Sequence, residues 1–152
     1  MSNQRRLSSE RPRDRLGRPL AFDADPSSIV EQVPPRSQLG GAEAWSEALA
    51  YLDQDLPFHA HEVFEQRWRC SPADERWAWQ LLAQWAAALT QRARGNPVGA
   101  QRVAQRALAS LDGGPAVPEP VDADLVRTSL VELITSPQPT STTASCTSHP
   151  RV

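Results

Sequence analysis

The sequence predicts an all-α protein, a small antiparallel bundle of four to five helices with disordered termini. Between about residues 41 and 135, apolar residues recur three and four positions apart, which is the spacing of an amphipathic helix. No stretch alternates apolar and polar residues as a half-buried strand would, so no sheet is expected. The connections between the predicted helices are short, which favours antiparallel neighbours.

Three helices are expected in the first half of the bundle. The first covers residues 41–54, where the apolar side chains form a single stripe. The second covers residues 57–70 and opens with Pro57, a residue that the first helical turn tolerates. The third covers residues 72–94 with Ser71 as its N-cap, and its apolar residues surround much of its circumference. We therefore expect the third helix to be the most buried.

Two further helices are expected toward the C-terminus. Asn96 followed by Pro97 is typical of an N-cap and first helical position, and the helix that follows, over residues 97–111, has the most regular apolar stripe. A weaker pattern predicts a last helix from Asp122 or Asp124 to about residue 135.

The chain is expected to have three parts. Residues 1–36 form a basic, proline-containing arm that is extended or disordered, with Leu16, Leu20 and Phe22 as the side chains that could lie on the domain. Residues 37–135 form the helical bundle domain. Residues 136–152 are rich in Ser, Thr and Pro, and we expect a disordered tail there.

Composition and charge exclude several classes of protein. No apolar run approaches the roughly 18–20 residues that span a membrane, and no apolar stretch follows the basic N-terminus as in a secretory signal. Two cysteines are too few for a disulfide framework, so we expect reduced thiols and a cytoplasmic location. Six arginines precede residue 20, but short basic arms are more often solvated, so nucleic-acid binding is not expected.

The second predicted helix carries ionisable side chains on its only plausible core face. Successive residues turn by 100°, which places these on one face: Phe58, His61, Phe64, Glu65 and Trp68. His61 and Glu65 are four residues apart and can touch. Glu62 lies at the edge of this face, whereas His59 points away and is expected to be exposed.

A buried carboxylate needs a partner, and the third helix offers amides. Gln80, Gln84 and Gln91 form a polar stripe there, which could face His61 and Glu65 if the two helices pack antiparallel. The predicted site is therefore a buried His-Glu-Gln cluster made of the following residues: His61, Glu62, Glu65, Gln84 and Gln91.

Three interpretations of this cluster are open. It could be a structural hydrogen-bond network that sets helix register, which is the most common role of buried polar groups. It could be a metal site with His61 and Glu65 as ligands and Glu62 as a further candidate. It could also be a small-molecule site in which Glu62 or Glu65 is a general base oriented by His61. The pattern is not a zinc-protease motif, because His59 and His61 are only two residues apart.

These residues resemble a known family. The segment PFHAHEVFEQRWR, the glutamines Gln80 and Gln84, and the later segment AALTQRARGNPVGAQRVAQRAL are similar to the helical family called domain of unknown function 309. That family combines an A-H-E-x-x-E-x-x-W helix with a later R-G-N segment, found here at residues 60–68 and 94–96. The likeness extends from about Arg11 to Leu111, and the arm looks like an actinobacterial-type variant.

The resemblance implies a compact α-helical bundle and places His61, Glu62 and Glu65 as the family's polar cluster. The family is sometimes labelled a predicted metal-dependent hydrolase, which implies a divalent metal. Gln91 stands where the family usually has a histidine, and Leu81 where it usually has a glycine. Since glutamine is a poor transition-metal ligand, both departures favour a structural role or a degenerate small-molecule or metal site.

The sequence thus predicts a helical domain of unknown biochemical function with two alternatives. One is a metal-dependent hydrolase with His61 and Glu65 as ligands and Glu62 as the catalytic base. The other is a helical interaction module for a protein partner or a second copy, in which an exposed Trp45 or Trp79 would anchor the contact.

Overall fold

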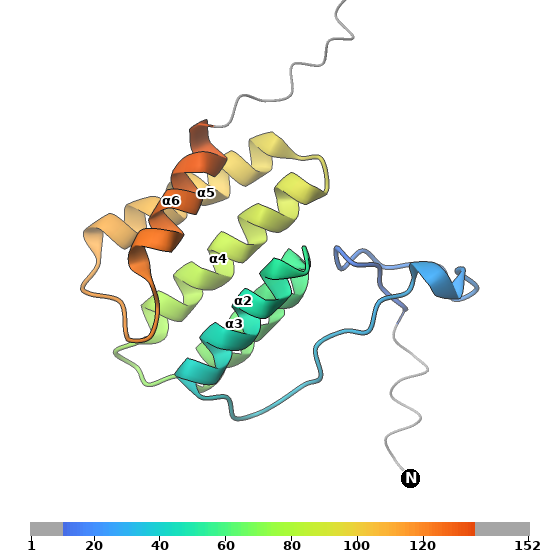
Figure 1. Cartoon of the computed structure of the whole chain (residues 1–152), viewed down its shortest axis with the longest axis horizontal. Coiled ribbons are helices and arrows are strands. Elements are labelled where there is room, and N and C mark those ends of the chain that lie inside the picture. The colour runs from blue at the N-terminus through green and yellow to red at the C-terminus, as the bar shows by residue number, and fades with distance from the viewer. Residues whose placement is uncertain (1–10, 136–152) are drawn as a thin grey trace, which may run out of the picture.

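Figure 1 shows the computed structural model, which describes residues 11–135. Within this range the chain forms α-helices and no β-strand, apart from one isolated bridge between Arg13 and Pro19. The all-α prediction is therefore confirmed. The elements, in chain order, are a short 3₁₀ turn η1 (Pro26–Ser28) and the helices α2 (Gly41–Asp53), α3 (Pro57–Cys70), α4 (Arg76–Ala93), α5 (Pro97–Gly113) and α6 (Ala123–Thr135).

The five helices form an up-and-down bundle in which successive helices run in opposite directions (Figure 1). Three residues, 54–56, join α2 to α3, and three, 94–96, join α4 to α5, so each pair must turn back on itself. Helix α4 is central, because α3, α5 and α6 all pack against it. None of the helices between residues 11 and 135 is both long and apolar enough to cross a membrane.

The ends of most helices agree with the sequence, and one differs. Pro57 is the first residue of α3, and the Asn96 side chain accepts a hydrogen bond from the Gly99 amide at 3.0 Å as the N-cap of α5. Ser71 is not the N-cap of the third helix. Its hydroxyl donates to the Trp68 carbonyl at 3.0 Å and so closes α3, and α4 begins only at Arg76 after a turn.

Aromatic rings fill the centre of the bundle. The ring centroid of Phe64 lies 6.2 Å from that of Trp85 and 6.4 Å from those of Trp45 and Trp79. Trp45 and Trp79 are both buried in this cluster, so neither is the exposed anchor that an interaction module would present. Pairs at these separations add to the stability that burial of the rings already provides.

The arm follows the surface of the bundle over residues 11–36. The bridge between Arg13 and Pro19 closes a small hairpin, and Gly17 at its tip has φ of 74°, a conformation that favours glycine. Beside the tip, Arg94 donates to the Leu16 carbonyl from Nε at 3.1 Å and from Nη2 at 2.6 Å. Phe22, by contrast, is 65 % exposed, so the expected contact of this side chain with the domain is not formed.

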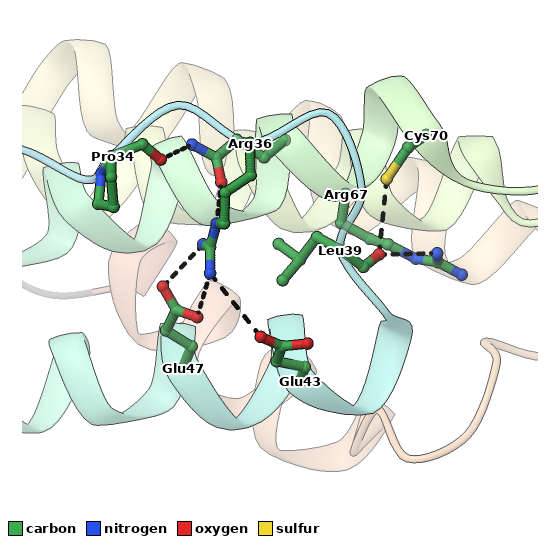
Figure 2. Close-up of polar contacts among 8 residues, drawn as sticks. Pro34, Arg36, Leu39, Glu43, Glu47, Arg67 and Cys70 are labelled. Atoms are coloured by element: carbon green, nitrogen blue, oxygen red, sulfur yellow. Dashed lines mark hydrogen bonds and ion pairs between the residues drawn. The ribbon is translucent and has the colours of Figure 1, made fainter.

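Arg36 fastens the end of the arm to α2 and α3. Its guanidinium donates to both carboxylate oxygens of Glu47, each at 2.8 Å, with Glu43 further away (Figure 2). Its Nε donates to Gln66 Oε1 at 2.9 Å, and Gln66 Nε2 donates to the Pro34 carbonyl at 2.8 Å. The hydrogen bonds to Glu47 raise the pKa of Arg36 above its ordinary value. The arm is therefore held against the bundle by specific hydrogen bonds and an ion pair.

The structure describes one of the two cysteines and does not cover the predicted C-terminal tail. Cys70 carries a free thiol, and its sulfur lies 3.5 Å from the Leu39 carbonyl (Figure 2). The second cysteine, Cys146, and the predicted tail over residues 136–152 lie outside the described part of the chain.

Candidate functional site

Helix α3 brings three predicted site residues together. His61, Glu62 and Glu65 each offer one ligand atom, and these atoms all lie within 4.8 Å of one another. The side chains of His61 and Glu65 are 21 % and 28 % exposed, so the cluster is half-buried rather than enclosed in the core. It lies at the surface edge of the α3–α4 contact, where a solute can reach it.

The hydrogen bonds of His61 determine the chemistry of its ring. Nδ1 lies 2.9 Å from the Ala83 carbonyl of α4, and since a carbonyl only accepts, Nδ1 carries a proton and donates. In the neutral ring, Nε2 is then a lone-pair acceptor, and it faces Glu65 Oε1 at 3.2 Å. Two acceptors facing each other at this distance repel, so the arrangement requires a second ring proton or a cation between them.

The glutamines of α4 do not join this cluster. No hydrogen bond within residues 11–135 connects Gln84 or Gln91 to His61 or Glu65. Gln91 accepts from Asn96 Nδ2 at 3.1 Å, and Gln84 lines a hollow formed with the end of α5. At the level of His61 it is residue 83 that faces α3, and residue 84 is turned by a further 100°.

His59 corrects a second expectation, because it is 1 % exposed instead of pointing into solvent. Its Nε2 lies 2.7 Å from the Glu31 carbonyl of the arm, and its ring centroid is 5.2 Å from that of Tyr51. The predicted core face of α3 is therefore wrong in most positions: Phe64 is buried, but Phe58, His61, Glu65 and Trp68 are only half-buried. The buried residues of α3 are Pro57, His59, Ala60, Val63, Phe64 and Gln66. The arm covers this side of α3, and a helical wheel, which considers one helix alone, cannot include contacts with the arm.

The surroundings of the two carboxylates differ. Glu65 Oε2 lies 3.4 Å from Nη2 of Arg69, whose side chain is mostly exposed, so solvent screens this pair. Glu62 lines a cavity of about 500 Å³ with Arg11 and Arg13 of the arm hairpin. Glu62 therefore faces a space that a small solute can enter.

A larger cavity lies elsewhere, between α2, α4 and α6. Its volume is about 820 Å³, and none of the three α3 site residues lines it. Sequence reasoning missed this feature, because it arises from the packing of three helices that are not consecutive in the chain.

Comparison with known protein families gives a match to the central part of the chain. Residues 45–103 match the model of a family described as Domain of unknown function (DUF309), and this segment contains the α3 cluster and all of α4. No curated protein and no solved structure matches the chain. Over residues 45–103, the chain is similar to the DUF309 family.

Proposed function

We propose that α3 carries a divalent-cation site whose ligands are His61 Nε2 and Glu65, with Glu62 beside them. One observation carries this proposal. The Nδ1 proton of His61 is committed to the Ala83 carbonyl, which leaves the Nε2 lone pair facing a carboxylate oxygen 3.2 Å away. A cation between these two atoms replaces their repulsion by two favourable contacts.

The donor set supports the same conclusion. A ligating histidine usually donates its other ring N–H to a backbone carbonyl or carboxylate, as His61 does to Ala83. One imidazole and two carboxylates form a mixed set that suits Zn²⁺ or Mn²⁺ better than a purely oxygen-ligated ion. The spread of at most 4.8 Å between the ligand atoms requires only small side-chain adjustments.

The finer proposal is a metal-dependent hydrolase. A cation held by two or three protein ligands keeps positions open to a substrate and can polarise it. Glu62, which faces the cavity under the arm, is then either a third ligand or the general base. We expect this activity in the cytoplasm, where a free thiol such as that of Cys70 persists.

Isothermal titration of the metal-free full chain with Zn²⁺ and Mn²⁺ tests the cation site. We expect one ion to bind per chain, and Glu65→Gln or His61→Gln to weaken binding at least about tenfold, since each removes a ligand. Glu119→Gln, an exposed residue in the α5–α6 loop with the same loss of charge, is the matched control and should bind normally. Equal binding by all three variants would contradict the proposal.

Glu62→Gln separates the two roles of Glu62. If Glu62 is a ligand, the substitution lowers the affinity for the ion. If Glu62 is the general base, the substitution leaves the affinity unchanged and removes metal-dependent hydrolysis. A structural role is the second candidate, because the His61–Ala83 hydrogen bond also ties α3 to α4. In that case no ion binds, and His61→Gln lowers only the free energy of unfolding, by about 1 kcal/mol.

A further inference from the structure

The cavity between α2, α4 and α6, here called the α2–α6 groove, has an apolar floor. Its volume is about 820 Å³. The floor consists of side chains from all three helices: Leu49, Leu52, Trp85, Leu89 and Leu125. Leu125 is 41 % exposed, so its side chain presents apolar surface to the groove. The Trp85 indole N–H is already satisfied by Ser129 Oγ at 2.8 Å, so the floor needs no polar ligand.

The shape of the groove fits a helix. Helix α6 packs against α4 and helix α2 packs against α3, but in the described part of the chain α2 and α6 do not pack against each other, which leaves open the space that both helices border. Helix α6 borders this space from Asp124 to Glu132, a rise of about 12 Å at 1.5 Å per residue. A bound helix would therefore contact α6 over about two turns.

The charge of the rim specifies the chemistry of that helix. The groove is bordered by five carboxylates and two arginines, which are Asp53, Asp55, Asp122, Asp124, Glu132, Arg15 and Arg92. Asp55 pairs with Arg15, and Asp122 caps α6 by accepting from the Leu125 amide. No ion pair within residues 11–135 engages Asp53, Asp124 or Glu132. The unsatisfied excess is acidic, so the complementary partner is basic.

One end of the groove already binds a basic side chain of this chain's own arm. Arg15 Nη2 donates to Asp55 Oδ2 at 2.6 Å and to the Asp55 carbonyl at 2.7 Å, while the adjacent Leu16 lines the groove. This end of the groove thus already accommodates an arginine next to a leucine.

We propose that the α2–α6 groove is the docking site for a basic amphipathic helix of a partner protein, with leucines on the floor and arginines on the rim. This site is separate from the α3 cluster and does not depend on a cation. The leucines supply the apolar contact, and Asp53, Asp124 and Glu132 select a basic partner over an acidic one.

Fluorescence titration of the full chain with two synthetic helical peptides tests this proposal. Both peptides have about 14 residues, with leucine at helical spacing on one face. On the positions that flank the leucine face, one peptide carries arginine and the other carries glutamate. Alanine occupies the other positions in both peptides. At about 50 mM salt, we expect the arginine peptide to bind and the glutamate peptide not to bind. Failure of the arginine peptide to bind at up to about 1 mM overturns the proposal.

Paired variants then locate the bound peptide. Leu125→Ser should weaken binding at least about tenfold, because Leu125 lines the groove. Val131→Ser is the matched control: Val131 lies on the same helix and is equally exposed, at 41 %, but it does not line the groove, so binding should not change. Asp124→Asn with Glu132→Gln should weaken binding similarly. Asp74→Asn with Glu119→Gln removes the same charge away from the groove and should have little effect.

Three results would contradict the docking site. One is equal weakening by the groove variants and by their matched controls, which indicates a non-specific charge effect. Another is unchanged binding in Asp124→Asn with Glu132→Gln, a surface pair whose replacement does not threaten folding. The third is a dimer in light scattering that Leu125→Ser dissociates, because a second copy of the chain would then occupy the groove.

Discussion

Arg36 should contribute more to stability than an ordinary surface ion pair. Its side chain is 25 % exposed and that of Glu47 is 27 % exposed, and the two form a bidentate pair with both oxygens at 2.8 Å. Exposed pairs are worth about 0–1 kcal/mol, whereas breaking a buried pair costs about 3–5 kcal/mol. For this intermediate burial we expect a coupling of about 1–2 kcal/mol between the two side chains.

Arg36→Met keeps the stem of the side chain and removes its hydrogen bonds. In addition to the coupling with Glu47, this change leaves Gln66 Oε1, on a buried residue, without the Nε donor 2.9 Å away. A buried acceptor without a partner costs about 1 kcal/mol or more. We therefore expect the free energy of unfolding to fall by about 2–3 kcal/mol in this variant, and by less in Glu47→Gln, which retains an oxygen acceptor.

A double-mutant cycle with urea unfolding measures the coupling directly. The tryptophans of the core report unfolding by fluorescence, and the urea midpoint of Arg36→Met should fall by about 1–2 M at an unchanged slope. Arg69→Met with Glu65→Gln is the control cycle, because that pair is 3.4 Å apart and Arg69 is exposed. A coupling below about 0.5 kcal/mol for Arg36 and Glu47 would refute the reasoning, since solvent would then screen both pairs alike.

Two other changes test how the arm and the helices are held. Gly17→Ala places a methyl group on the Phe58 ring in addition to the strain of φ 74°, whereas Gly95→Ala at φ 82° meets open space. Urea unfolding should therefore show a loss of about 1 kcal/mol for Gly95→Ala and a clearly larger loss for Gly17→Ala. Asn96→Ala removes the N-cap of α5 and should cost about 1 kcal/mol by the same assay, whereas an unchanged midpoint would show that water replaces the cap.

The helices were predictable because their signals are local. Pro57 and the Asn96–Pro97 pair mark helix starts through the backbone preferences of proline and asparagine, which hold wherever those residues lie in the fold. Ser71 failed as a start signal, because its hydroxyl can equally donate to the preceding helix, and the choice depends on how the chain turns.

The candidate site was only partly predictable. His61 and Glu65 meet because residues four apart on a helix are neighbours, a relation that the sequence contains. The burial of His59 depends instead on the arm, whose Glu31 carbonyl reaches it from 28 residues away in the chain. The contact of His61 with Ala83, rather than with a glutamine, depends on the rotation of α4 about its axis, which the amphipathic pattern specifies too coarsely.

The state of the His61 ring is the most direct test of the cation site. A long-range ¹H–¹⁵N spectrum of the histidine side chains should show His61 protonated at Nδ1, because that atom donates to the Ala83 carbonyl. On addition of Zn²⁺, the Nε2 resonance of His61 should shift while that of His59 does not. A ring protonated at Nε2, with resonances that Zn²⁺ leaves unchanged, would contradict the proposed site.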